Sequence, residues 1–156
     1  MIEFDENRKR SVCITGHRTL EKDITKEYVE EWLNKAIDKN FDTFYVGMAL
    51  GFDTLCFQVL EKIRKKRKIK IIACIPCPSQ PVKFSFFQKL EYYRMIKSAD
   101  EKVVLSETYT PYCMQKRNQY MVDHSSAVLA YLRRNYGGTA NTVNYAKKNG
   151  VPVRII

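Results

Sequence analysis

Residues 43–53 read Thr-Phe-Tyr-Val-Gly-Met-Ala-Leu-Gly-Phe-Asp: an apolar run, two glycines and an acidic residue, with apolar residues at helical spacing beyond them. A continuous apolar run is typical of a strand buried on both faces in a parallel sheet. Glycine allows the backbone to approach a ligand closely, and the first N–H groups of the next helix have no partner within that helix. The stretch therefore predicts a strand, a turn and a helix, with an anion such as phosphate bound at the turn.

The same arrangement recurs near the C-terminus. Residues 126–132 have the composition of a strand, and Tyr136-Gly137-Gly138-Thr139 leads into another helical segment. Turns that follow parallel strands meet at one edge of the sheet. We therefore expect the two glycine turns to form one shared site.

Strand and helix patterns alternate along the chain. Strands are predicted at residues 11–15, 43–46, 70–75, 102–105, 127–131 and 151–156, and helices at 25–40, around 55–63, at 84–96, 113–124 and 142–148. This alternation implies right-handed crossovers and a sheet covered on both faces. The predicted fold class is α/β, a Rossmann-like three-layer α/β/α sandwich with a mostly parallel sheet. Residues 1–156 are expected to form one domain, with residues 1–10 loosely held.

The chain is strongly basic, with a formal net charge of +10 and a pI of about 9.4. Such a charge favours contact with nucleotides, nucleic acid or other polyanions. A dense group of cations comprises Lys62, Arg64, Lys65, Lys66, Arg67, Lys68 and Lys70. This basic cluster is either a solvated helix end, where cations are favoured, or a patch for single-stranded nucleic acid.

Several classes of protein are disfavoured. The N-terminus is acidic without a signal-peptide core, and the five cysteines lie on apolar segments, so a cytoplasmic location is expected. No apolar run approaches the about 18 residues of a spanning helix, so no membrane role is indicated. Cys74-Ile-Pro-Cys77 has redox spacing but ends a strand, which favours packing over reactivity. With two histidines and no second cysteine pair, neither a zinc site nor a required cofactor is indicated.

Two common nucleotide fingerprints are also missing. Gly47 and Gly51 do not fit G-x-G-x-x-G, and the sequence has no G-x-x-x-x-G-K-S/T. Asp53 is either a helix N-terminal partner or a ligand for a ribose hydroxyl. Gly16-His17-Arg18 follows the first strand, where Arg18 can bind phosphate through two N–H groups or pair with a surface carboxylate. His17 can act as acid or base near neutral pH.

Five blocks, in order along the chain, resemble the YpsA-like group of the SLOG superfamily, which is related to DNA-processing protein A and the Lonely-guy proteins. They are Ile14-Thr15-Gly16-His17-Arg18, residues 47–53, residues 75–80, Arg117-Asn118 through Met121-Val122-Asp123, and Gly137-Gly138-Thr139. The resemblance implies a Rossmann-like fold with a pocket for a nucleotide or nucleotide derivative, and suggests self-association.

The resemblance also implies the residues of that pocket. The expected nucleotide-binding residues are Gly16, His17, Arg18, Gly47, Met48, Ala49, Gly51, Asp53, Pro76, Gln80, Arg117, Asn118, Gly137, Gly138 and Thr139. Asp123 either contacts the ligand or orients Arg117. If the protein is an enzyme, the candidates for acid–base catalysis are Asp53, Asp123 and His17.

One departure bears on catalysis. Lonely-guy enzymes carry P-G-G-x-G-T-x-x-E, whereas residues 136–142 read Tyr-Gly-Gly-Thr-Ala-Asn-Thr, so Thr142 stands roughly where the glutamate is expected. A threonine cannot stabilise an oxocarbenium-like centre as a carboxylate does. The leading hypothesis is therefore binding or sensing of an ADP-ribose-like or NAD-like ligand. The alternatives are a nucleotide-processing enzyme acting on an N-glycosidic or phosphate bond, and single-stranded DNA binding.

An aromatic helix is predicted after residue 84. Its apolar residues are Phe84, Phe86, Phe87, Leu90, Tyr92 and Tyr93. We expect mostly core packing from them. One ring stacking on a base, and a surface for self-association, remain open alternatives.

Overall fold

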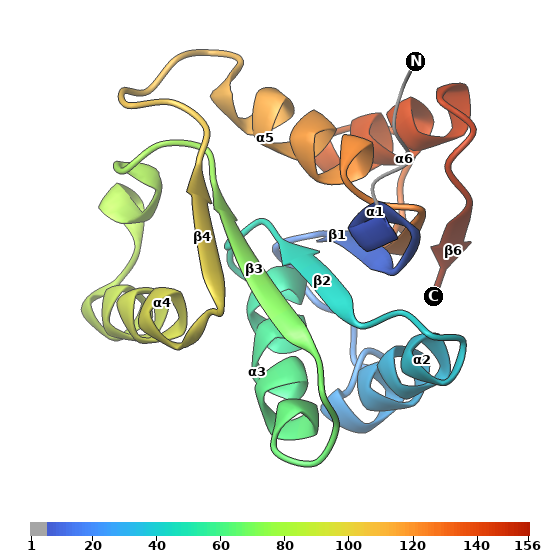
Figure 1. The fold of residues 1–156 in the computed structure, drawn as a ribbon. Coiled ribbons are helices and arrows are strands. Elements are labelled where there is room, and N and C mark those ends of the chain that lie inside the picture. Colours follow the sequence, from blue (N-terminus) through green and yellow to red (C-terminus); the bar gives the residue numbers. More distant parts are fainter. Residues whose placement is uncertain (1–5) are drawn as a thin grey trace.

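Six strands form one parallel sheet in the order β4-β3-β2-β1-β5-β6 (Figure 1). The strands are β1 (Ser11–Gly16), β2 (Thr43–Val46), β3 (Lys70–Ile75), β4 (Glu101–Val104), β5 (Ala127–Tyr131) and β6 (Val153–Ile155). The computed structural model describes residues 6–156. Every neighbouring pair of strands is parallel, which confirms the predicted α/β Rossmann-like fold.

Helices cover both faces of this sheet (Figure 1). The helices are α1 (Glu6–Lys9), α2 (Lys26–Asp38), α3 (Phe52–Arg64), the 3-10 helix η1 (Gln80–Lys83), α4 (Phe86–Ser98), α5 (Cys113–Asp123) and α6 (Gly138–Lys148). One core layer joins the sheet to α2, α3 and α4, and the other joins it to α5 and α6. In β1, Val12 and Ile14 enter the first layer while Cys13 enters the second. This alternation explains the continuous apolar runs of the sequence.

The order of the strands creates a switch point. From β1 the chain moves outward through β2 and β3 to β4, and it then returns to β5 on the other side of β1. Connections diverge above the carboxyl ends of β1 and β5, where α/β sheets leave a crevice for ligands. The turns after β1, β2 and β5 all lie at this edge of the sheet.

Two helix starts differ from the prediction in an informative way. The helix predicted from residue 84 begins at Phe86, because Ser85 and Gln88 form a reciprocal capping box that starts α4 there, and the separate 3-10 helix η1 precedes it. Helix α6 begins at Gly138, four residues before the predicted start. The double glycine is therefore the N-terminus of the helix itself.

The structure describes the second half of the N-terminal segment, residues 6–10. Of residues 1–10, predicted to be loosely held, residues 1–5 lie outside the described part of the chain. Glu6–Lys9 form α1, where the Ser11 hydroxyl donates to the Asn7 carbonyl at 2.6 Å and Arg8 Nε donates to the Asp123 carbonyl at 3.0 Å.

The aromatic helix does not pack as predicted. Tyr92 is buried and Phe84 is half-buried against the core, as expected. However, Phe86, Phe87, Leu90 and Tyr93 are exposed. The capping box fixes the helix so that its inner face presents Tyr92 and Met95, and these four residues fall on the outer face.

Candidate functional site

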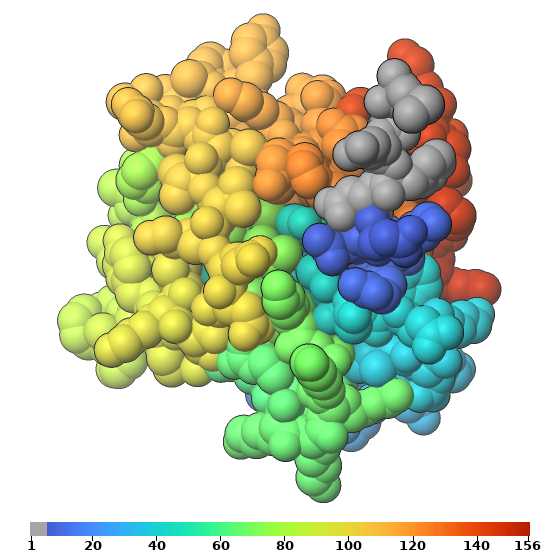
Figure 2. Space-filling model, viewed as in Figure 1, coloured from blue at the N-terminus to red at the C-terminus, as the bar shows by residue number. Residues whose placement is uncertain are grey.

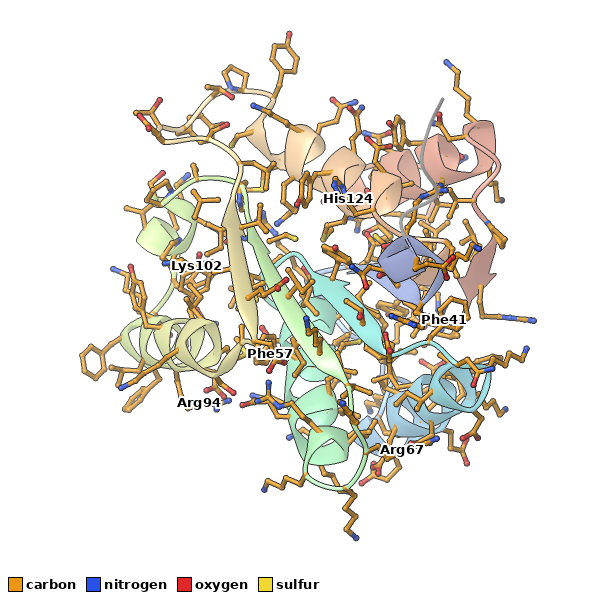
Figure 3. All side chains as sticks on the ribbon, viewed as in Figure 1. Phe41, Phe57, Arg67, Arg94, Lys102 and His124 are labelled. Atoms are coloured by element: carbon orange, nitrogen blue, oxygen red, sulfur yellow. The ribbon has the colours of Figure 1, made fainter. Side chains whose placement is uncertain are left out.

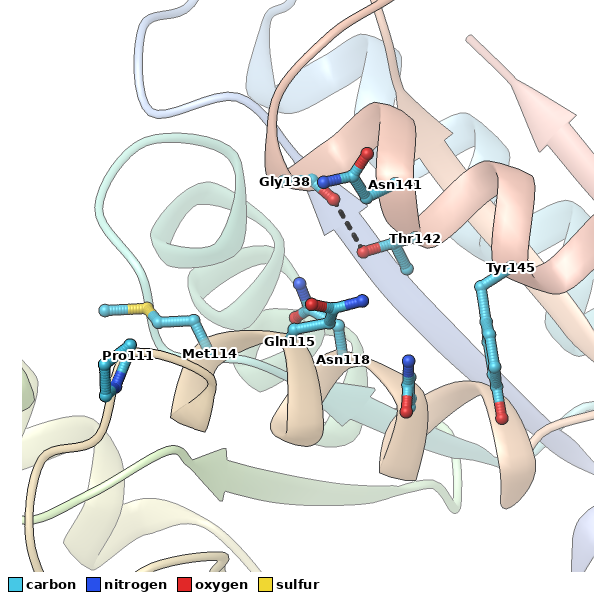
Figure 4. A pocket seen from close by; sticks show the side chains of 9 residues that line it. Pro111, Met114, Gln115, Asn118, Gly138, Asn141, Thr142 and Tyr145 are labelled. Carbon is cyan, nitrogen blue, oxygen red and sulfur yellow. Dashed lines mark hydrogen bonds between the residues drawn. The ribbon is translucent and has the colours of Figure 1, made fainter.

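A groove made of three adjoining cavities follows the carboxyl edge of the sheet. The switch-point cavity, of about 570 Å³, lies between the turn after β1, the first turn of α6 and the side chains of Asp53 and Arg117. The apolar cavity, of about 580 Å³, is lined by Leu50, Val82, Phe84 and Tyr109 among others. A smaller cavity of about 240 Å³ lies between α5 and α6 (Figure 4). Met114 borders all three.

The N-terminus of α6 is open to the switch-point cavity. Its N-cap, Gly137, has a φ of +94° and no side chain to accept from the first N–H groups. A Cβ on Gly138 would have no heavy atom within 4 Å, so this turn faces free space. Thr139 lines the cavity beside it. Unpaired N–H groups and the positive end of the helix dipole suit an anion.

Two guanidinium groups line the same cavity. Arg18 and Arg134 are both exposed, and within residues 6–156 no ion pair joins either of them to a carboxylate. Arg133, by contrast, lies 3.3 Å from both Glu21 and Asp23. Arg134 was not among the predicted residues, although it shortly precedes the glycine turn. The two guanidinium groups and the α6 N-terminus together can neutralise a phosphate.

The turn at residues 47–53 is held by contacts within the protein. Gly51 has a φ of +83°, and a Cβ there would lie 2.2 Å from the Arg18 carbonyl oxygen. The Phe52 N–H donates to the His17 carbonyl at 3.1 Å, and the Ala49 N–H donates to Asp53 Oδ2 at 3.1 Å. The protein itself thus occupies the N–H groups of Ala49 and Phe52. Gly51 allows the turns after β1 and β2 to pack closely, and Gly47 leaves room for the side chains of Arg117 and Asp53.

The Gly47 carbonyl oxygen is the point where several predicted ligand residues meet. Arg117 Nη1 donates to it, and Gln80 Nε2 donates to it at 3.0 Å. Tyr92 in turn donates to Gln80 Oε1 at 2.9 Å. Arg117 and Gln80 therefore support the turn in which Met48 adopts a φ of +64°. Such a conformation persists in a side-chain-bearing residue only when its surroundings hold it.

Not every predicted residue reaches the groove. The predicted residues that line the switch-point or apolar cavity are Gly16, His17, Arg18, Ala49, Asp53, Gln80, Arg117, Asn118, Gly138 and Thr139. Pro76 is buried at the end of β3, and Met48 is buried in the core. Asn118 Oδ1 accepts from Arg117 Nε at 2.7 Å.

Asp53 is an unusual group for such a groove. It is 5% exposed, and its Oδ1 is buried without a hydrogen-bond partner in the described chain. Burial raises the pKa of the Asp53 carboxyl from 3.8 to about 6, although Arg117, the Ala49 N–H and Arg18 all act to lower it. The carboxylate therefore lacks one hydrogen-bond donor at an oxygen that is closed to solvent.

The raised pKa predicts a pH dependence of stability. Below about pH 4 the carboxyl is protonated in both states. As pH rises towards 6, the unfolded chain loses this proton first, so the free energy of unfolding falls by up to about 3 kcal/mol. Asp53→Asn is thus expected to be more stable than the parent at pH 8 and similar at pH 4. Denaturant unfolding of both proteins across this pH range measures the difference in the free energy of unfolding. A difference that did not change with pH would contradict the prediction.

The other candidate acid–base groups are placed differently. His17 is buried, its Nε2 accepts from the Arg133 N–H at 2.9 Å, and burial and the nearby arginines lower the pKa of its imidazole. The ring is therefore neutral at pH 7. Asp123 ends α5, where its Oδ1 accepts from the Tyr145 hydroxyl at 2.8 Å. The structure brings Asp123 neither to the switch-point cavity nor to Arg117.

The cysteines are buried and form no disulfide in the described chain. Burial raises the pKa of the Cys74 thiol to about 12, which leaves it uncharged and unreactive at neutral pH. No cluster of three potential metal-ligating side chains occurs within residues 6–156. None of the helices in that range has the length and apolar content needed to cross a membrane.

The basic cluster, residues 62–70, lies at the opposite edge of the sheet, where α3 ends and β3 begins. Four of its cations contact acidic side chains, namely Lys62 with Glu30, Arg64 with Asp100, Arg67 with Asp38 and Lys70 with Glu101. Figure 3 shows Arg67 at the far end of α3, and the green side chains of this segment project from the lower end of the molecule in Figure 2. The cluster and the glycine turns therefore do not form one groove.

Comparison with known proteins identifies the family of the chain. A family model described as the YspA SLOG family matches residues 8–156. The chain is 37% identical to the uncharacterized SPbeta prophage-derived protein YoqJ of Bacillus subtilis, over 81% of this chain and 80% of the relative.

Two solved structures share the fold. DNA processing protein A from Helicobacter pylori, whose single-stranded DNA binding mode has been described, superposes with a TM-score of 0.70 at 18% identity, over 96% of this chain. The Streptococcus pneumoniae protein of that name gives 0.70 at 17% identity, also over 96%. This chain spans 66% and 50% of those two chains. The ordered motifs, the fold and the family match agree, and the chain belongs to the YpsA family of SLOG proteins.

Proposed function

We propose that the groove binds a nucleotide or nucleotide-derived ligand, such as an ADP-ribose-like or NAD-like compound. The observation that carries this proposal is the uncapped N-terminus of α6 facing a cavity lined by Arg18 and Arg134, neither of which pairs with a carboxylate of the described residues. A phosphate there receives backbone N–H groups, the Thr139 hydroxyl and two guanidinium groups.

The rest of the groove suits the other parts of a nucleotide. Asp53 borders the switch-point cavity, and its unpartnered Oδ1 can accept from a ribose hydroxyl once the carboxylate turns towards the cavity. The apolar cavity beside it offers Phe84, Tyr109 and Met114 to a flat base. Each of the two larger cavities has the size of a small-molecule site, and together they suit a ligand with separate polar and apolar ends.

Arg134→Gln tests the anion site. We expect a loss of about tenfold in affinity for ADP-ribose or the tightest nucleotide of a panel, because a charge-assisted hydrogen bond is removed. Calorimetric titration measures it. Lys66→Gln removes an equal charge at the opposite edge of the sheet and should bind like the parent. Equal affinity of Arg134→Gln and the parent, or no binding of any mono-, di- or cyclic nucleotide, would refute the proposal.

A nucleotide-processing enzyme is the second candidate, favoured by the Asp53 pKa of about 6 in a ligand groove. Thr142 supports binding over hydrolysis, because its hydroxyl donates to the Gly138 carbonyl at 2.8 Å and no carboxylate takes its place (Figure 4). Incubation with AMP, NAD and cytokinin-type monophosphates separates the two. Release of free base that Asp53→Asn abolishes would establish the enzyme.

A further inference from the structure

The outer face of α4 carries a ridge of exposed apolar side chains. Phe86 is 70% exposed, Phe87 79%, Leu90 54% and Tyr93 57%, and Val82 of η1 continues the ridge at 65%. Residues 86, 90 and 93 recur at intervals of four and three, so they share one line along the helix. Soluble proteins rarely expose so many large apolar groups together without an interaction that covers them.

The ridge is held rigidly by the rest of the molecule. On the inner face of α4, Tyr92 and Met95 are 2% exposed and belong to the core. Arg94 donates to Glu61 of α3 through two N–H groups at 2.8 Å each. The helix therefore cannot turn its outer face inward without breaking the core. The exposed apolar side chains therefore face the solvent or a binding partner.

The charges around the ridge are positive. Lys83, Lys89 and Lys97 lie beside it and have no acidic partner within residues 6–156. Glu91 is the one acidic residue between residues 82 and 98, and it pairs with Arg94, which also pairs with Glu61 of α3. Apolar side chains flanked by unpaired lysines complement a surface that is apolar inside and anionic at its boundary.

A second copy of the chain fits this charge pattern poorly. In two copies packed through this face, Lys83, Lys89 and Lys97 of one copy would meet a surface that carries the same three lysines, and Glu91, the one acidic residue between residues 82 and 98, is already paired with Arg94. Like charges brought together in this way repel. The ridge also projects outward, and its α4 residues line none of the three groove cavities.

We infer that α4 attaches the protein reversibly to anionic lipid surfaces. Phe86, Phe87, Leu90 and Tyr93 enter the boundary between headgroups and acyl chains, and the three lysines contact the anionic headgroups. This binding needs no spanning helix. Because Val82 and Lys83 also line the apolar cavity, the mouth of the groove then opens beside the lipid surface.

Co-sedimentation with vesicles tests this inference. We expect the parent to sediment with vesicles of equal parts phosphatidylcholine and phosphatidylglycerol, and far less with phosphatidylcholine alone. Lys83→Gln/Lys89→Gln/Lys97→Gln should lower the partition coefficient by about 100-fold, at about fivefold per lysine. Phe86→Ser/Leu90→Ser should lower it by about tenfold or more through lost apolar burial. Circular dichroism confirms that these surface variants are folded.

Lys65→Gln/Lys66→Gln/Lys68→Gln is the matched control, since it removes the same charge from the opposite edge of the sheet. If this control lost as much binding as the α4 triple variant, net charge alone would explain the partition and the inference would fail. It would also fail if the parent did not sediment with the anionic vesicles, even if it bound an acidic peptide. A dimer in sedimentation velocity that Leu90→Ser abolishes would assign the ridge to a second copy instead.

Discussion

Replacing Gly51 by alanine is expected to lower the free energy of unfolding by about 4 kcal/mol. The residue has a φ of +83°, where an L side chain costs about 1–2 kcal/mol, and the new Cβ would lie 2.2 Å from the Arg18 carbonyl oxygen. Backbone cannot rotate away as a side chain can, so relieving the clash costs about 1–3 kcal/mol more. Denaturant unfolding at neutral pH measures the loss.

Substitutions at two other glycines separate the conformational cost of Gly51→Ala from its steric cost. Gly150 has a φ of +73°, and a Cβ added there would have no heavy atom within 4 Å, so Gly150→Ala should cost only the conformational part, about 1 kcal/mol. Gly138 has open space and an ordinary φ, so Gly138→Ala should change stability by less than about 0.5 kcal/mol while crowding the anion site. A loss at Gly51 no larger than that at Gly150 would show that the two turns are not tightly packed.

Arg117→Met is expected to lower the free energy of unfolding by about 3 kcal/mol at pH 7. Arg117 is 5% exposed and is the strongest favourable charge acting on the Asp53 carboxylate, which would remain buried without it. The Gly47 carbonyl would also lose one of its two side-chain donors. Because Asp53 can then take up a proton, the loss should be smaller at pH 4 than at pH 7, and unfolding curves at both values measure it.

A double-mutant cycle shows whether the loss of stability in Arg117→Met depends on Asp53. If Asp53 is responsible, Arg117→Met in the Asp53→Asn background should cost about 1–3 kcal/mol less than in the parent. Arg67→Met is the matched control, because Arg67 pairs with Asp38 near the surface and its loss should cost less than about 1 kcal/mol. Additive effects of the two substitutions would mean that Arg117 acts through packing alone.

Much of the fold could be predicted because its signals are local. Strands β2, β3 and β5 begin and end at the predicted residues, since buried parallel strands appear as short, uninterrupted apolar runs. Alternation with helices then implied the parallel sheet. Four apolar residues of α4 were predicted to be buried in the core but are exposed. The apolar residues of α4 are spread over all sides of the helix, so its sequence does not indicate which face is buried.

The candidate site was predictable in position but less so in detail. Glycine spacing identified the turns at the sheet edge, yet it could not separate a glycine that faces open space, such as Gly138, from one that faces another turn, such as Gly51. That difference depends on neighbours far apart in sequence. Arg134 was missed because the sequence alone does not distinguish the two adjacent arginines. Only the folded chain shows that Arg133 pairs with Glu21 and Asp23, which leaves Arg134 without a carboxylate partner among the described residues.

Met114 borders all three cavities of the groove, and its Sδ accepts from Arg117 Nη2 at 3.9 Å. Arg18 and Ala49 also border both larger cavities, and Asn118 and Gly138 border both the switch-point cavity and the smaller one. A thioether with three rotatable bonds changes conformation at little cost. We therefore expect the rotamer of Met114 to change how widely the cavities communicate, while the strand ends and the other shared residues stay fixed.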